Sequence, residues 1–114
     1  MAVEVQTHRF KVAEYHLMAK AGIFHEDDRV ELFQGEVIQM CPKGRLHAAC
    51  VTRFNHLLVE KLHGKALVRV QDPFELEEYS EPEPDLVVAR HRPDFYASGH
   101  PRPQDILLLV EVAD

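Results

Sequence analysis

Two short apolar runs, each bordered by an acidic residue, constrain this 114-residue chain more than any other feature of its sequence. One run follows Pro84 and Asp85 in the segment PDLVVAR, and the other precedes Glu111 in ILLLVEV. Short apolar runs of this kind are typical of buried strands, and an acid beside a buried segment is costly unless a partner compensates its charge. If the two strands are antiparallel neighbours, Asp85 and Glu111 lie side by side at one edge of the sheet.

Such a pair of carboxylates indicates a metal site. Carboxylate and carbonyl oxygens are the ligands that Mg²⁺ and Mn²⁺ prefer. The backbone carbonyl of Val112 offers a third ligand, and a metal held there would polarise a phosphodiester and activate an attacking water. Two alternatives stay open from the residues alone: Asp85 caps loop amides at the start of its strand, or Glu111 pairs with an arginine.

The composition suits a single soluble domain. Apolar residues make up 46% of the chain and charged residues 28%, which is a globular balance, and the length allows one domain at most. No apolar run is long enough for a membrane span, and the first residues lack the pattern of a secretory signal. Cys41 and Cys50 are too few for a disulfide framework, so we expect a reducing, cytoplasmic setting.

The net charge of −6 argues against a general nucleic-acid binder, because such proteins usually carry a basic face. Acidic residues gather between Asp72 and Asp85, and we expect those of 75–83 to form a solvated loop. Either DNA is not the partner, or its binding needs metal ions and a local basic face.

The first part of the chain predicts a helix followed by a hairpin. Residues 11–21 place apolar side chains on one helical face, and Gly22 fits the C-cap. In the segment RVELFQGEVIQM, a two-residue turn at Gln34 and Gly35 would join two short strands. The pairs predicted across this turn are Phe33 with Glu36, Leu32 with Val37 and Glu31 with Ile38.

A second helix, at 47–62, and three strands, at 66–71, 84–90 and 106–112, are predicted next. The last strand is apolar on both faces and should be central in its sheet, and the proline-rich segment 91–105 should be a long exposed loop. This order predicts a mixed α/β (α+β) fold, with few elements to cover a central strand. The apolar stripe of the second helix is Leu46, Cys50, Phe54, Leu57 or Leu58, and Leu62.

Three further residues are candidates for the same site. Glu31 lies between apolar neighbours in the hairpin and could add a ligand, directly or through a bound water, with Glu36 as its substitute. His47 begins the second helix, where backbone amides attract anions, so it could contact a phosphate. Each of the three also fits a plain surface position. No histidine in the sequence shows HExxH or other zinc spacing.

Several segments together resemble one family. They include EYHLMAKAG, DRVELFQGEVIQM, HAACVTRFNHLL, EPEPDLVV and LLLVEVAD. In this order they resemble the Uma family, a former domain of unknown function whose members are described as putative bacterial endonucleases, within the restriction-endonuclease-like superfamily of the PD-(D/E)XK motif. The resemblance implies a mixed sheet with flanking helices, Mg²⁺ or Mn²⁺ as cofactor, and hydrolysis of DNA phosphodiester bonds.

The resemblance also implies residue roles. Asp85 matches the aspartate of the motif, Glu111 matches its second acid, and Glu31 matches the glutamate of the family's hairpin. His47 matches a histidine at the start of the family's helix. The motif's lysine is expected two residues after the second acid, where Ala113 stands, and in this family a following helix, which this sequence lacks, supplies the basic residue.

We therefore expect residues 1–114 to be the N-terminal and central part of a single restriction-endonuclease-like domain, truncated at its C-terminus and weakly active or inactive alone. Three hypotheses follow: a metal-dependent endonuclease or a truncated copy of one, an inactive nuclease-fold protein that binds or interacts, and a structural module. The last predicts that Asp85 and Glu111 lie far apart. DNA is the expected partner of the first, a homodimer would suit cleavage of both strands, and no membrane partner is expected.

Overall fold

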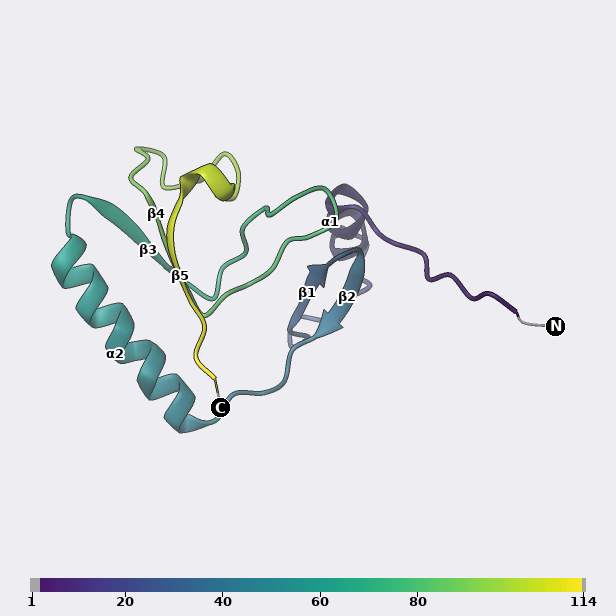
Figure 1. The fold of residues 1–114 in the computed structure, drawn as a ribbon, viewed down its shortest axis with the longest axis horizontal. Helices are drawn as coiled ribbons and strands as arrows, with labels where there is room; N and C mark the ends of the chain where they lie inside the picture. Colours follow the sequence, from purple (N-terminus) through teal and green to yellow (C-terminus); the bar gives the residue numbers. More distant parts are fainter. Residues whose placement is uncertain (1–2, 114) are drawn as a thin grey trace.

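The chain folds into two lobes joined by long connecting segments, as Figure 1 shows. This computed structural model describes residues 3–113. The helices and antiparallel strands of these residues confirm the predicted mixed α/β (α+β) class. One lobe holds α1 (Val12–Lys20), β1 (Val30–Phe33) and β2 (Glu36–Gln39), and the other holds α2 (Arg45–Leu62), β3 (Ala66–Val70), β4 (Leu86–Arg90), the short 3-10 helix η1 (Pro103–Asp105) and β5 (Ile106–Val110).

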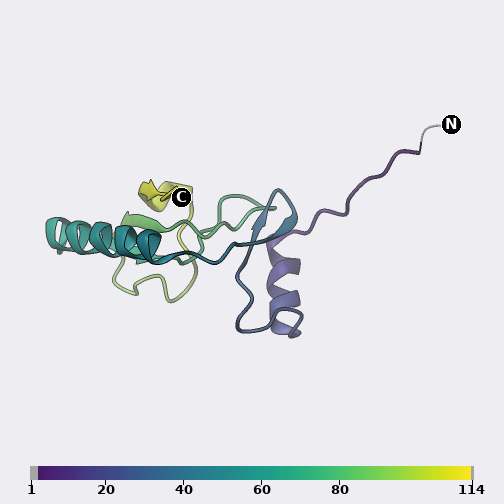
Figure 2. The same cartoon turned by 90° about the horizontal axis from the view of Figure 1, so that it is seen from below.

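The lobes lie at opposite ends of an elongated body. Seen from below, α2 and the three-stranded sheet occupy one end, and α1 stands across the other end (Figure 2). The segment before α1 runs away from the body in both views. The last described residues lie beside the start of α2 (Figure 1), so the end of β5 and the beginning of α2 meet at one place.

The hairpin has the register that its sequence predicts. Gln34 and Gly35 have φ angles of 51° and 80°, the left-handed values of a type I′ turn, whose twist matches that of the strands. Leu32 is completely buried, whereas Phe33, on the other face, is exposed. The pairs are Val30 with Gln39, Glu31 with Ile38, Leu32 with Val37 and Phe33 with Glu36.

The hairpin turn is held between two distant parts of the chain. The N–H of Gly35 donates to the carbonyl of Tyr79 at 2.8 Å, and the carbonyl of Gly35 accepts from the N–H of Phe10 at 2.9 Å. A Cβ atom on Gly35 would lie 2.5 Å from the Cβ of Arg9. Glycine is therefore required here for its backbone conformation and for the close approach of the N-terminal segment.

Polar contacts fix α1 to the rest of its lobe. Tyr15 is the buried residue of this helix, and its hydroxyl donates to the carbonyl of Val30 at 3.2 Å. Nε2 of His16 lies 2.7 Å from Oε2 of Glu81, a buried residue. The prediction that the acids of 75–83 form a solvated loop is wrong for Glu81, because folding brings His16 to its carboxylate from a distant part of the sequence.

The other lobe is built on an antiparallel sheet in the order β3-β4-β5. Residues 86–89 of β4 are buried, and two of them, Val87 and Ala89, form the core with Phe74 and Tyr96. The prediction that the last strand is central is wrong. Both β3 and β5 pair with β4, so β5 is left at the edge within the described residues, and residues 107–109 are about half exposed.

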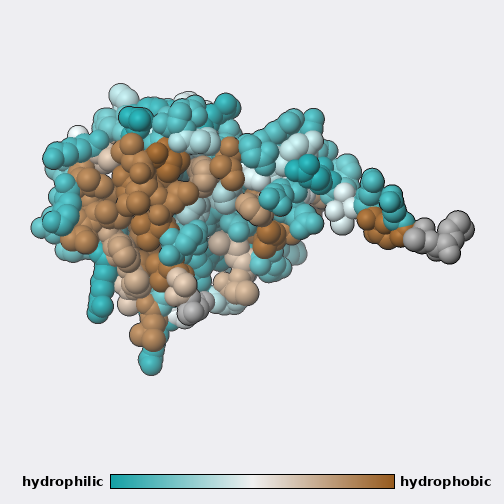
Figure 3. Space-filling model, viewed as in Figure 1, coloured by the Kyte–Doolittle hydropathy of each residue, from teal (hydrophilic) through white to brown (hydrophobic). Residues whose placement is uncertain are grey.

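The buried face of α2 differs from the predicted apolar stripe. Its buried residues are His47 and Val51, one turn apart, whereas Leu46 is 81% exposed and Phe54 is 39% exposed. The difference arises because His47 turns toward a carboxylate at the sheet edge, which leaves Leu46 on the surface. Figure 3 shows the apolar surface that remains open between α2 and β5.

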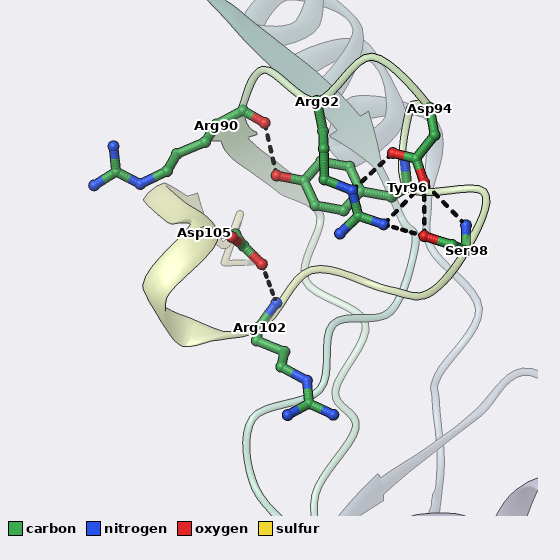
Figure 4. A network of polar contacts seen from close by, with 7 residues as sticks. All are labelled: Arg90, Arg92, Asp94, Tyr96, Ser98, Arg102 and Asp105. Carbon is green, nitrogen blue, oxygen red and sulfur yellow. Dashed lines mark hydrogen bonds and ion pairs between the residues drawn. The ribbon is translucent and has the colours of Figure 1, made fainter.

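The segment between β4 and β5 is a long and largely exposed loop, as its prolines predict, and its own side chains hold it together. The carboxylate of Asp94 accepts hydrogen bonds from Arg92 at 2.7 and 3.0 Å and from the hydroxyl of Ser98 at 2.7 Å (Figure 4). Tyr96 is buried, and its hydroxyl donates to the carbonyl of Arg90 at 2.6 Å. These contacts fold the loop back onto β4, where Tyr96 joins the core.

Replacing the turn glycine tests the contact between the hairpin and the N-terminal segment. Gly35→Ala should lower the free energy of unfolding by about 2 kcal/mol, because alanine is strained at a left-handed φ and its Cβ would meet Arg9. Gly64→Ala is the matched control, since Gly64 has a φ of +77° but nothing within 4 Å of an added Cβ. Urea unfolding compares the two. Equal losses would show that the close approach at Gly35 contributes nothing.

Candidate metal site

The strand register brings Asp85 and Glu111 to the same edge of the sheet. β4 and β5 are antiparallel, and their pairing begins with Leu86 opposite Val110. Asp85 immediately precedes Leu86 and Glu111 immediately follows Val110, so the two acids occupy the next opposing positions. The N–H of Val112 donates to Oδ2 of Asp85 at 2.8 Å, which ties the chain after β5 directly to the acid before β4.

The carboxylate of Asp85 is completely buried and fully engaged. Its Oδ1 accepts a hydrogen bond from the ammonium of Lys43. Its Oδ2 accepts from the N–H of Val112 and lies 3.2 Å from Nε2 of His47. Burial alone would raise the pKa of Asp85, but the hydrogen bonds from Lys43 and Val112 and the charges of Lys43 and His47 outweigh burial and hold this pKa below its ordinary value.

Lys43 is the site residue that the sequence does not single out. It lies in the connection between β2 and α2, between Pro42 and Gly44. A lysine between a proline and a glycine belongs to no motif, and this stretch predicts only an interruption of the secondary structure. One signal was available: Lys43 precedes His47 by four residues at a helix start, so both side chains can reach one point beside it.

His47 is buried in the structure and is not a surface histidine. It occupies the third position of α2, where its Nε2 faces the carboxylate of Asp85. Its Nδ1 is buried and has no hydrogen-bond partner within the described residues. The imidazole therefore helps to orient Asp85, and the phosphate contact expected of His47 stays a prediction.

Glu31 connects the hairpin lobe with the segment that leads to Asp85. It is half-buried on β1, and its Oε2 accepts a hydrogen bond from the N–H of Glu83 at 2.9 Å. This contact fixes the chain two residues before Asp85. Glu36 is exposed beside the hairpin turn, and the structure gives it no contact with the other acids.

Glu111 is exposed but lies in the field of the other acids. Partial burial raises the pKa of Glu111, the charges of Asp85 and Glu31 raise it further, and the charge of Lys43 lowers it. None of the ion pairs within residues 3–113 joins Glu111 to an arginine. Burial is the largest cause of this upward shift, and the charge of Lys43 only partly offsets it, so Glu111 takes up a proton more readily than a free glutamate does.

The donors of this edge suit a divalent cation, although the protein side chains alone do not complete its coordination shell. Within the described part of the chain, no three His, Cys, Asp or Glu side chains converge to hold a metal ion. What the edge provides is two adjacent carboxylates and backbone carbonyls, all hard oxygen donors of the kind that Mg²⁺ and Mn²⁺ prefer. Mg²⁺ sites commonly use one or two carboxylates and complete their shell with water.

Comparison of the whole sequence with known protein families identifies the family of this chain. A family model described as "Putative restriction endonuclease" matches residues 12–114. The chain belongs to the Uma2 family. This confirms the resemblance, and membership of the Uma2 family indicates a nuclease-like function. None of the curated proteins compared with this Uma2 chain is a significant match.

Within residues 3–113, no helix combines the length and the apolar character needed to span a membrane.

The acids of this Uma2 chain predict how its stability depends on pH. Burial raises the pKa of Glu83 and of Glu111 above the ordinary 4.5, so the folded chain binds these protons more readily than the unfolded chain. The free energy of unfolding should therefore rise as the pH falls toward about 4.5. Asp85 affects stability in the opposite direction. Its contribution to the free energy of unfolding is complete above about pH 3.8 and is lost as the pH falls through its lowered pKa.

Urea unfolding at a series of pH values checks this profile. We expect greater stability at about pH 5 than at pH 7, followed by a steep loss below about pH 4. Glu83→Gln should flatten the rise, and Glu60→Gln, on the exposed side of α2, is the control. A stability that decreased steadily on acidification from neutral pH would contradict the expected signs.

Proposed function

We propose that this chain provides the acidic residues of a metal-dependent endonuclease that hydrolyses DNA phosphodiester bonds. One observation carries the proposal: the register of β4 and β5 sets Asp85 opposite Glu111 at one edge of the sheet. Membership of the Uma2 family supports it. A purely structural module gives no reason for a buried acid and a second acid to meet at this edge.

In this proposal Asp85, Glu111 and the carbonyl of Val112 hold Mg²⁺ or Mn²⁺. The bound ion would supply polarisation of the scissile phosphate and a lowered pKa of the attacking water. The charges of Asp85 and Glu31, which add to burial in raising the pKa of Glu111, support a cation at this point. The net charge of −6 fits the same reading, because an acidic chain approaches DNA more easily when a metal ion lies between its carboxylates and the phosphates.

The chain's own residues have supporting roles in this scheme. The N–H of Val112 and Nε2 of His47 hold one oxygen of Asp85, which fixes the direction of the carboxylate. Glu31, through Glu83, fixes the segment that enters β4. Lys43 is a cation at the site, although Ala113 stands at the lysine position of the motif.

The proposal also includes the substrate, the cellular location and the oligomeric state. The substrate is DNA, the location is the cytoplasm, which suits the free thiols of Cys41 and Cys50, and a homodimer would present one site to each strand. The assignment of 1–114 as the N-terminal and central part of a single restriction-endonuclease-like domain stays a prediction.

A second candidate is a non-catalytic nuclease-fold protein that binds or interacts. The contact between Lys43 and Asp85 favours it, because an internal ion pair neutralises the buried acid without any metal. Ala113 in place of the motif's lysine points the same way. The two candidates differ in one measurable property, which is metal binding that depends on both Asp85 and Glu111.

A metal titration followed by thermal unfolding distinguishes them. Metal that binds only the folded chain should stabilise it by about 2.7 kcal/mol at roughly 100 times Kd, which raises Tm by several degrees. Asp85→Asn and Glu111→Gln should abolish the rise with both Mg²⁺ and Mn²⁺. Glu36→Gln, which alters an exposed acid outside the site, should keep it. An unchanged Tm of the unaltered chain with both ions would favour the non-catalytic candidate.

Nicking of supercoiled plasmid DNA tests the chemistry itself. We expect slow cleavage that requires Mg²⁺ or Mn²⁺, is lost in Asp85→Asn and Glu111→Gln, and is retained in Glu36→Gln. Slow turnover is expected because alanine occupies the motif's lysine position. Metal binding at Asp85 without any cleavage would show that residues 1–114 bind the metal but are not sufficient for hydrolysis.

A further inference from the structure

The ammonium of Lys43 contacts the oxygen of Asp85 to which a metal ion would bind. The side chain of Lys43 is 19% exposed, and its ammonium contacts Oδ1 of a carboxylate that is 1% exposed. The other oxygen, Oδ2, already receives the N–H of Val112 and the imidazole of His47. Each carboxylate oxygen offers about two lone-pair positions, so Oδ1 is the oxygen with room for a further cation, and Lys43 is the cation already there.

Two cations cannot share this oxygen without strong repulsion. A Mg²⁺ or Mn²⁺ ion bound to Oδ1 would lie about 2.1 Å from it, within a few ångströms of the ammonium of Lys43. Like charges at that separation repel strongly where little water screens them, and Asp85 is completely buried. Binding of a metal and retention of the Lys43 contact are therefore mutually exclusive at Oδ1.

We propose that Lys43 is an internal competitor for the metal site: its ammonium holds Asp85 in the metal-free chain and must leave Oδ1 when a divalent cation binds. The inference rests on the proposed function, since it assumes that Asp85 is a metal ligand. As a consequence, the acidic edge binds a metal ion more weakly than it would without Lys43, because part of the free energy of metal binding is used to displace the ammonium.

The surroundings of Lys43 allow this exchange. The side chain is long and flexible, and it reaches Asp85 from a connection in which both Pro42 and Gly44 are exposed. Rotation within the lysine side chain, which is already partly exposed, can carry the ammonium from Oδ1 to solvent. The charge of Lys43 already acts on Glu111, so the displaced ammonium would remain near an acid.

Calorimetric titration with Mn²⁺ tests the competition on the unaltered chain and four variants. Lys43→Met keeps the length of the side chain and removes its charge, so it should bind Mn²⁺ at least about tenfold more tightly than the unaltered chain. Lys43→Arg keeps the charge and should bind no more tightly than the unaltered chain. Lys65→Met alters an exposed lysine beyond α2 and should leave the affinity unchanged. Adding Asp85→Asn to Lys43→Met should remove the binding.

A second measurement needs no variant, which matters because Lys43→Met leaves Asp85 buried without its cation and could unfold the chain. Acetylation of lysines in the unaltered chain, read by mass spectrometry, reports the accessibility of each ammonium. Saturating Mn²⁺ should increase the acetylation rate of Lys43 several-fold, and that of Lys65 should stay constant. If Lys43→Met does not fold, this measurement decides.

The outcomes separate this inference from the proposed function. Mn²⁺ binding that requires Asp85, combined with an affinity of folded Lys43→Met no higher than that of the unaltered chain, overturns the competition and leaves the metal site standing. An acetylation rate of Lys43 that is unchanged or lower with Mn²⁺ overturns it as well. Absence of Asp85-dependent Mn²⁺ binding in both the unaltered chain and Lys43→Met overturns the metal site and the competition together.

Discussion

The burial of one carboxylate, that of Asp85, is the constraint on which the sheet edge with the candidate site depends. A buried acid needs donors for both oxygens, and here they come from three separate parts of the chain: Lys43 before α2, His47 inside α2 and the amide of Val112 after β5. Meeting that need brings the start of α2 to the end of β5. The polar contacts at Asp85 therefore position a helix as much as they prepare a site.

Local patterns were sufficient to predict the hairpin and the meeting of the two acids. The register of β1 and β2 follows from a two-residue turn with Gly35 at a left-handed φ, which leaves few other pairings of the same residues. Asp85 and Glu111 were predicted as neighbours because one opens and the other closes an apolar strand. That inference needed only an antiparallel arrangement of adjacent strands, which the register shows.

Features that depend on tertiary contacts cannot be predicted from local sequence patterns. The spacing of apolar residues in α2 favours a face containing Leu46, yet His47 is buried because its partner is a charge and not an apolar side chain. The pairing of His16 with Glu81 is equally non-local. Lys43 offers only its spacing from His47 as a signal, because its importance comes from what folding places opposite its ammonium.

The two acids of the edge are electrostatically unequal, and this inequality supports the proposal of a metal ion between them. Lys43 and the amide of Val112 hold the pKa of Asp85 low, whereas burial and the charges of Asp85 and Glu31 raise that of Glu111. A single ammonium thus compensates the buried acid, but at Glu111 it does not offset burial and the charges of the nearby acids. A doubly charged ion between the two carboxylates would satisfy both, and it would then have to replace the cation that folding supplies.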